Sequence, residues 1–438
     1  MNFAIVRYLI GWMLGIESIF LLLPALTAVI YGEPELPAYL IAAAISLAGA
    51  ALLCHRKPKN TRFYAREGYV TVALCWLILA VIGALPFVLS REIPFFIDAL
   101  FETVSGFTTT GATILGDVEA LSHASMLWRC LTHWVGGMGV LVFMLIVLPL
   151  AGGQTIFLMR AESPGPSVSK MSPRMRDTAT ILYAIYFGLT VLQMILLFIG
   201  GMPFFDAICV SLGTAGTGGF GNWNDSIAHY NSAYLQNVIT VFMILFGINF
   251  SAYFLILTRK FRQAFRIEEI RVYLGVIFVF AGLIAFNVRP MFGSLRESFH
   301  HALFQVASII TTTGFSTVDF DQWPTFSRAL LVLLMFIGAC AGSTGGGIKC
   351  SRILLLGKSV KKELMCLIHP RLVRVNKMDG QRVPHEVMRS INVFVVAYAF
   401  IFILSLLIIS LNCEDLVTCF TSVATTLNNV GPGLSLCG

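Results

Sequence analysis

The chain has 438 residues, of which 57% are hydrophobic and only 12% charged, and its mean hydropathy is +0.81. Soluble domains carry about a quarter charged residues, so this composition excludes an ordinary water-soluble enzyme. The formal net charge of +7 is unevenly spread, because 24 of the 30 Lys and Arg residues fall in the stretches 55–68, 160–177, 259–271 and 349–390. The positive-inside rule places these stretches and the N-terminus in the cytoplasm and leaves an acidic opposite face, whose carboxylates include Glu33, Glu92 and Asp117.

Ten apolar stretches are candidates to cross a bilayer. They lie at about 4–30, 37–54, 69–90, 124–150, 179–200, 232–258, 272–289, 326–348, 351–368 and 391–411. Four more, at 97–107, 204–215, 298–310 and 414–424, are only about 17 Å long as helices, half a bilayer. Backbone that turns back at membrane depth is tolerated only where protein shields it or it lines a watery cavity. The four short stretches therefore predict re-entrant half-helices beside a pathway.

The half-helices also form an internal repeat. Aligned without gaps they start at Asp98, Asp206, His301 and Asp415, and thirteen residues later stand Gly111, Gly219, Gly314 and Asn428. We predict an all-α polytopic membrane protein with four pseudo-symmetric repeats of span, half-helix, loop and span around one pore, preceded by two extra helices. The expected parts are a preface at 1–54 and repeats at 69–151, 179–258, 272–369 and 391–438. The third has a broken second span, and the fourth is incomplete, so we expect these 438 residues to stop short of a last helix.

Each half-helix leads into a loop of Thr and Gly, in which no side chain ionises. Such loops offer backbone carbonyl oxygens, and four copies around an axis could replace the hydration shell of a cation. Glycine supplies the positive φ that turns successive carbonyls one way. A carboxylate ring, which calcium or magnesium would require, is missing from the loops, so the pattern favours a monovalent cation. The acidic residues of the opposite face then have two interpretations. They reflect only the orientation of the chain in the membrane, or they concentrate cations at a pore mouth.

A cluster of small residues interrupts the expected 326–348 span. Glycine is costly inside a helix, at about 1 kcal/mol relative to alanine, so the cluster indicates either close helix packing or a broken helix whose loop gates the pathway. Lys349 follows, and we expect it to snorkel to the inner face rather than to charge the ion path. The residues of this stretch are Gly342, Ser343, Thr344, Gly345, Gly346, Gly347 and Lys349.

Arg129 and His133 stand one turn apart near the outer start of the 124–150 span. We expect them to make helix-end or interhelical hydrogen bonds, with a proton relay as the alternative. The sequence contains no GxSxG nucleophile motif and no GxxxxGK[ST] phosphate loop, and so no catalytic residue is predicted.

Together the motifs resemble the bacterial Trk/Ktr and plant HKT superfamily of potassium transporters. They are TTTGAT, GTGGFG, TTTGFS and TTLNNVGPG in the four loops, HWVGGMG at 133–139 and GACAGSTGGGIK at 338–349. The two-helix preface makes the chain most similar to TrkH-type membrane subunits. The resemblance implies potassium uptake across the bacterial inner membrane by a multi-pass protein with a cytoplasmic N-terminus. A sodium- or proton-coupled cation symporter is the alternative function, and an intramembrane enzyme is a weaker one.

The same resemblance implies a homodimer, a cytoplasmic NAD-binding regulatory subunit and an intramembrane gate loop at the glycine cluster. NAD or ATP would then act only through that regulatory partner; no covalent cofactor and no nucleic acid are expected, and potassium is the substrate. Because asparagine enters left-handed conformations readily, we expect Asn428 to keep the backbone role of glycine. The implied potassium-binding filter residues are Thr110, Gly111, Gly218, Gly219, Thr313, Gly314, Leu427 and Asn428.

Overall fold

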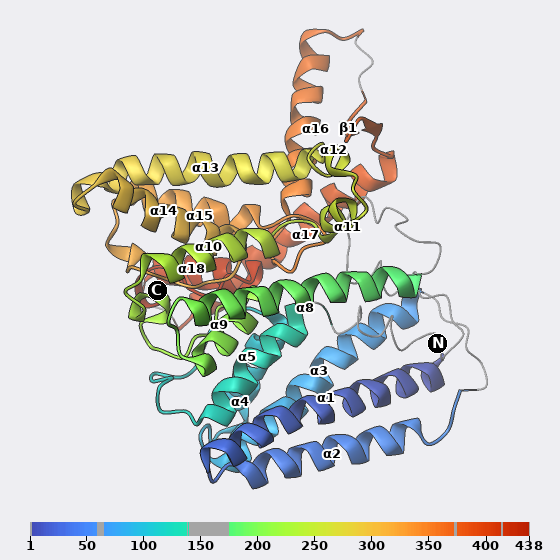
Figure 1. Ribbon diagram of the computed structural model, residues 1–438. Coiled ribbons are helices and arrows are strands. Elements are labelled where there is room, and N and C mark those ends of the chain that lie inside the picture. The colour runs from blue at the N-terminus through green and yellow to red at the C-terminus, as the bar shows by residue number, and fades with distance from the viewer. Residues whose placement is uncertain are drawn as a thin grey trace. The chain divides into compact units, whose positions relative to one another are not determined.

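The computed structural model describes residues 2–58, 65–137, 139, 175–371, 375–412 and 415–437. Almost all regular structure in this part of the chain is α-helical, as Figure 1 shows. The chain forms two compact units, one of Met1–Pro164 and Lys170–Val238 and the other of Gly165–Ser169 and Ile239–Gly438. Each unit has its own apolar core, with Leu21 and Tyr39 fully buried in the first and Ile277 and Leu331 in the second.

The first unit opens with two long helices that pack side by side. The turn between them begins at Gly32, whose φ of 69° ends the first helix. The pair packs closely, because the Ser46 hydroxyl donates to Leu14 O at 2.8 Å and a Cβ on Gly11 would lie 2.6 Å from Cys54 Sγ. The helices of this unit are α1 (Phe3–Tyr31), α2 (Leu36–Cys54), α3 (Ala65–Ser90), α4 (Phe96–Thr108), α5 (His123–Gly137), α8 (Met175–Ile199) and α9 (Phe204–Gly216). The turn η2 (Ser226–His229) and α10 (Ala233–Phe246) follow, and α10 continues into the second unit.

The second unit contains the remaining helices and one small hairpin. Strands β1 (Lys377–Met378) and β2 (Gln381–Arg382) pair antiparallel. The positive φ values of Asp379 and Gly380 between them are those of a type I′ turn. The helices are α11 (Phe250–Leu257), α12 (Phe261–Ala264), α13 (Glu268–Val288), α14 (Leu295–Ile310), α15 (Thr325–Ile337), α16 (Cys350–Ile368), α17 (His385–Ile409) and α18 (Leu416–Asn428), with 3₁₀ turns η3 (Arg289–Met291), η4 (Phe320–Gln322) and η5 (Ser435–Cys437).

Six described helices are long and apolar enough to cross a bilayer, namely α1, α2, α3, α8, α13 and α17. They confirm the helices predicted at 4–30, 37–54, 69–90, 179–200, 272–289 and 391–411. Large apolar side chains point outward from them, with Leu52 75%, Phe286 74% and Val396 71% exposed, as expected for surfaces that face lipid. The four predicted half-helices are α4, α9, α14 and α18.

Three predicted spans differ from the structure. The stretch 232–258 is not one straight helix, because α10 and α11 meet at 92° across residues 247–249. The stretch 351–368 forms α16, but its Lys, Arg and Glu residues keep it out of the helices apolar enough to cross a membrane. The stretch 326–348 is helical only as far as Ile337. Of the span expected at 124–150, α5 covers the part to Gly137, and residue 138 and the stretch 140–150 lie outside the described residues.

Candidate functional site

The four half-helices end in the same cap. At the end of α4, Thr109 N donates to Gly106 O at 3.0 Å and Thr110 N donates to Ser105 O at 2.9 Å. These two bonds form a Schellman motif, which requires a left-handed residue at the helix end. The same two bonds recur in the other copies, and the left-handed residues are Thr109, Thr217, Thr312 and Asn429, with φ of 59°, 53°, 59° and 65°.

A second left-handed residue follows each cap at a spacing of two, and it is always glycine. These glycines are Gly111, Gly219, Gly314 and Gly431, with φ of 78°, 78°, 85° and 95°. An L-residue in this conformation costs about 1–2 kcal/mol. The four loops are thus the same backbone structure with one obligatory glycine each.

The structure therefore corrects the residues predicted for the fourth loop. Asn428 was expected to adopt the left-handed backbone, but it is the last residue of α18. The gapless alignment matched Asp98, the third residue of α4, with Asp415, which lies just before α18 begins. That offset of three residues moves the position of Gly111 from Asn428 to Gly431.

Leu427 and Asn428 instead anchor α18. The Asn428 side chain donates to Ala424 O at 2.8 Å and accepts from the Tyr398 hydroxyl at 2.9 Å, and Leu427 packs on the apolar core of its unit. The loop positions that match Thr110 and Gly111 are Val430 and Gly431.

Within the first unit, the first two loops approach each other closely. A Cβ added to Gly111 would overlap the carbonyl oxygen of Gly218, and one added to Gly218 would overlap the ring of His133. At position 111, glycine is required both by the neighbouring carbonyl and by the positive φ. The structure thus brings the predicted residues Thr110, Gly111, Gly218 and Gly219 together.

Within the second unit, the third and fourth loops approach each other in the same way. A Cβ on Gly314 would lie 2.5 Å from Val430 O and 2.9 Å from Pro432 Cδ. Thr313 is fully buried, and its hydroxyl lies 2.7 Å from that of Thr311. The structure thus brings Thr313 and Gly314 together with Val430 and Gly431, the revised residues of the fourth loop.

The glycine cluster is a non-helical segment between α15 and α16, so a broken helix accounts for it rather than the close packing of one continuous helix. It lies against the ends of the third and fourth half-helices. Gly346 N donates to Thr312 Oγ1 at 2.6 Å, and Cβ atoms on Gly345 and Gly346 would lie 2.8 Å from Thr311 O and 3.1 Å from Asn428 O. We call residues 338–349 the glycine loop.

The expectation that Lys349 snorkels is wrong. Its Nζ turns back into the glycine loop and donates to Gly345 O, and its backbone φ is 82°. The loop carbonyl thus takes the place of water around the ammonium group.

Sequence reasoning missed the two groups that hold the glycine loop. Glu269, 2% exposed, accepts from Ala341 N at 2.7 Å and from Ser351 N at 3.0 Å. At the break between α10 and α11, Phe250 N donates to Gly342 O at 2.9 Å and Cys340 N donates to Gly247 O at 3.1 Å. The only sequence signal was Gly247 near Asn249 within an apolar run.

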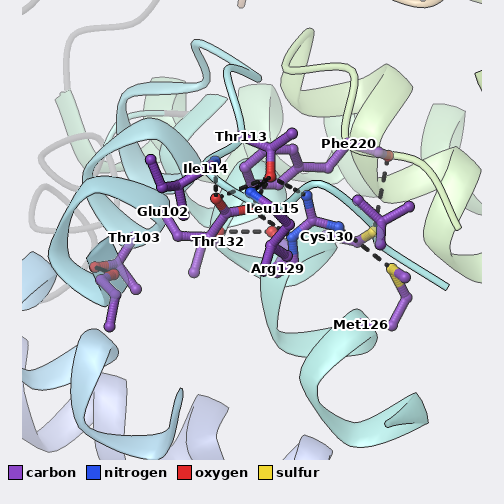
Figure 2. Close-up of polar contacts among 12 residues, drawn as sticks. Glu102, Thr103, Thr113, Ile114, Leu115, Met126, Arg129, Cys130, Thr132 and Phe220 are labelled. Carbon is purple, nitrogen blue, oxygen red and sulfur yellow. Dashed lines mark hydrogen bonds and ion pairs between the residues drawn. The ribbon is translucent and has the colours of Figure 1, made fainter. Parts of the chain in front are cut away.

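Arg129 makes an interhelical contact, as expected, whereas His133 contacts Phe220 in the loop after α9. Arg129 forms a buried ion pair with Glu102 of α4, and His133 stacks on Phe220 with ring centroids 4.0 Å apart. Figure 2 shows Arg129 and Glu102 pointing toward each other beside Thr113 and Phe220. Glu102 was another residue that the sequence did not single out.

Two carboxylates of the acidic face cap α5. Glu92 Oε1 accepts from Ser122 N at 2.7 Å, and Glu33 accepts from His123 N at 2.7 Å and from Ala124 N at 3.0 Å. Acidic caps of this kind stabilise a helix N-terminus. Part of the acidic face therefore has a structural role. Among the described residues, no group of three or more His, Cys, Asp and Glu could hold a metal ion.

The sequence matches the profile of the TrkH family, described as cation transport protein, over residues 37–436. The chain belongs to the TrkH family. It is 38% identical over 443 aligned residues to the Trk system potassium uptake protein TrkH of Salmonella typhimurium, with 100% of this chain and 92% of that protein covered. It is 34% identical to the Trk system potassium uptake protein TrkG of Escherichia coli, with 98% and 90% covered.

A solved structure agrees with the TrkH family assignment. The crystal structure of the potassium transporter TrkH from Vibrio parahaemolyticus matches with a TM-score of 0.89 and 32% identity, covering 100% of this chain and 92% of that one. This match confirms the predicted all-α membrane fold. Because the TrkH family consists of transporters, the chain is not an enzyme, as its sequence predicted.

Proposed function

We propose that this TrkH-family chain carries potassium across the bacterial inner membrane through a filter of four carbonyl loops. The filter residues are Thr110, Gly111, Gly218, Gly219, Thr313 and Gly314, with Val430 and Gly431 in the fourth loop. The observation that carries the proposal is the fourfold repetition of a Schellman cap followed by a left-handed glycine. Rings of backbone carbonyls can replace the hydration shell of potassium.

Two further features support cation transport. The relatives at 38% and 34% identity are named as potassium uptake proteins. On the acidic face, hydrogen bonds from the Asn224 amide and from backbone N–H groups hold the pKa of Asp117 below its ordinary value, which keeps this exposed carboxylate ionised. Ionised carboxylates raise the local concentration of cations.

The glycine loop is the proposed gate, formed by Gly342, Ser343, Thr344, Gly345, Gly346 and Gly347 with Lys349. Its contacts with Thr312 and with the end of α18 would couple any movement of the loop to the third and fourth filter loops. We further propose the division into a preface and four repeats, with the N-terminus in the cytoplasm.

The proposed assembly is a homodimer with a cytoplasmic NAD-binding regulatory subunit, and NAD or ATP acts only through that subunit. Sodium- or proton-coupled symport is the competing mechanism. In that case uptake would require an inward gradient of the coupling ion.

Expression of the chain in a bacterium without its own potassium uptake tests the function. We expect growth at low potassium to be restored. A matched strain carrying Gly111→Ser should grow less well, because its Cβ meets the Gly218 carbonyl. Absence of rescue by wild-type chain shown to be in the membrane would contradict the proposal.

A further inference from the structure

Glu102 and Arg129 form a buried ion pair in the first unit. Arg129 Nε lies 2.7 Å from Glu102 Oε1, and the two side chains are 2% and 0% exposed. Burying two charges costs desolvation that their attraction does not necessarily offset. A buried pair is therefore weak evidence for stability, and its contacts indicate what else it does.

Glu102 binds the segment that leaves the first filter loop. Its two carboxylate oxygens accept from the Thr113 hydroxyl, each at 3.0 Å, and Oε2 also accepts from Ile114 N at 3.1 Å. Thr113 and Ile114 are the second and third residues after Gly111. Figure 2 shows these bonds converging on the carboxylate.

Arg129 contacts the second filter loop. Its Cζ lies 4.1 Å from the ring centroid of Phe220, the residue directly after Gly219. Phe220 also stacks on His133, and Phe220 N donates to His133 Nδ1 at 3.4 Å. The charged pair between α4 and α5 thus contacts the residues that directly follow the first and second filter loops.

In the third repeat, neutral side chains of the half-helix bind the residues that follow the filter loop. Gln305 stands four residues after His301, as Glu102 stands four residues after Asp98. Gln305 Nε2 donates to Val318 O at 3.2 Å, and the Ser308 hydroxyl donates to Phe315 O at 2.6 Å. Neutral hydrogen bonds are therefore sufficient to hold the residues that follow a filter loop against its half-helix. The charges at Glu102 and Arg129 need another explanation.

We propose that Glu102 and Arg129 are positioning residues that fix the first and second filter loops relative to each other and thereby set the preference for potassium over sodium. The inference rests on the proposed function. Charge-assisted hydrogen bonds are shorter and stronger than neutral ones, so they restrict the small movements by which carbonyls could close around the smaller ion. The pair touches no ion itself, and it acts through Thr113, Ile114 and Phe220.

The test is the ratio of potassium to sodium flux in liposomes holding the purified full chain. Glu102→Gln and Arg129→Gln should each lower the ratio about tenfold, which corresponds to about 1.4 kcal/mol. Glu102→Gln gives the first repeat the same side chain that Gln305 provides in the third. The double variant should recover part of the ratio, because it leaves no unpaired buried charge. Arg328→Gln, which breaks the half-exposed pair with Asp321, is the matched control and should leave the ratio unchanged.

Thr113→Val keeps the side-chain volume, removes one hydroxyl and leaves both charges, so it tests the same link if the charge variants fold poorly. It should also lower the ratio. Wild-type ratios in the folded variants, whatever their melting temperatures, would overturn the inference while leaving the proposed function intact. A wild-type chain with no preference for potassium would instead overturn the proposed function, and the inference with it.

Discussion

At the scale of single residues, Gly111 and Gly314 are positions where a left-handed backbone and a close approach of another chain segment coincide. Gly111 and Gly314 each face a carbonyl of the neighbouring loop in their own unit. A side chain there meets two penalties, the positive φ and the overlap. Substitution should therefore alter the loop rather than only destabilise the protein.

Gly314→Ser should lower the potassium preference roughly tenfold, because the left-handed penalty is about 1–2 kcal/mol and the new Cβ would lie 2.5 Å from Val430 O. Competition of sodium with potassium uptake measures this. Gly282→Ser is the matched control, since nothing lies within 4 Å of a Cβ at that position in α13. An unchanged preference in Gly314→Ser would remove this glycine from the filter.

A second pair of variants tests the revised register of the fourth loop. Gly431→Ala should lower potassium preference, because its φ is 95°. Asn428→Ala should instead cost about 1–3 kcal/mol of stability through the unpaired hydroxyl of Tyr398, with the ion preference kept. Thermal melting and ion competition separate the two effects. The reverse result would restore the position predicted from the sequence.

At the scale of elements, the glycine loop is a break that other elements hold in place. Glu269 of α13 accepts from the backbone N–H of Ala341 in the loop and from that of Ser351 at the start of α16, and the bend between α10 and α11 supplies two backbone bonds. Hydrogen bonds to a charged group contribute about 1.5–3 kcal/mol each. Glu269 should thus have a large effect on the closed position of the loop.

Glu269→Ala should raise potassium leak severalfold at least, since a loss of about 1.5 kcal/mol already shifts a two-state equilibrium more than tenfold. Flux from liposomes without any regulatory partner measures the leak. Glu268→Ala, next to it, breaks a partly exposed pair with Lys358 and should leave the leak unchanged. Equal leak in both variants would show that Glu269 does not hold the gate closed.

Hydropathy and spacing predicted six long spans among the described residues, the half-helices and three of the four loops, because these features are local. The bend after Phe246 was missed, since an apolar run reads the same whether its backbone continues straight or turns. The fourth loop was misplaced because the gapless alignment matched Asp98, the third residue of α4, with Asp415, the residue before α18. Glu102 and Glu269 were missed because their partners lie far along the chain, as with Ser351, 82 residues from Glu269.

At the scale of the whole molecule, each compact unit carries two of the four repeated loops. The sequence places the basic stretches on one side of the membrane and an acidic face on the other. A membrane potential contributes about 2.3 kcal/mol per charge for each 100 mV, which is sufficient to drive entry of a cation through such a path. We therefore expect a permeation protein that is driven by voltage and selective for potassium.

The most direct test is potassium and sodium flux through the purified chain in liposomes under an imposed voltage. We expect potassium flux at least about tenfold above sodium flux, following voltage without any proton or sodium gradient. We also expect Gly111→Ser to reduce this ratio. Equal flux of the two ions, or a ratio unchanged by Gly111→Ser, would contradict a filter built from these four loops.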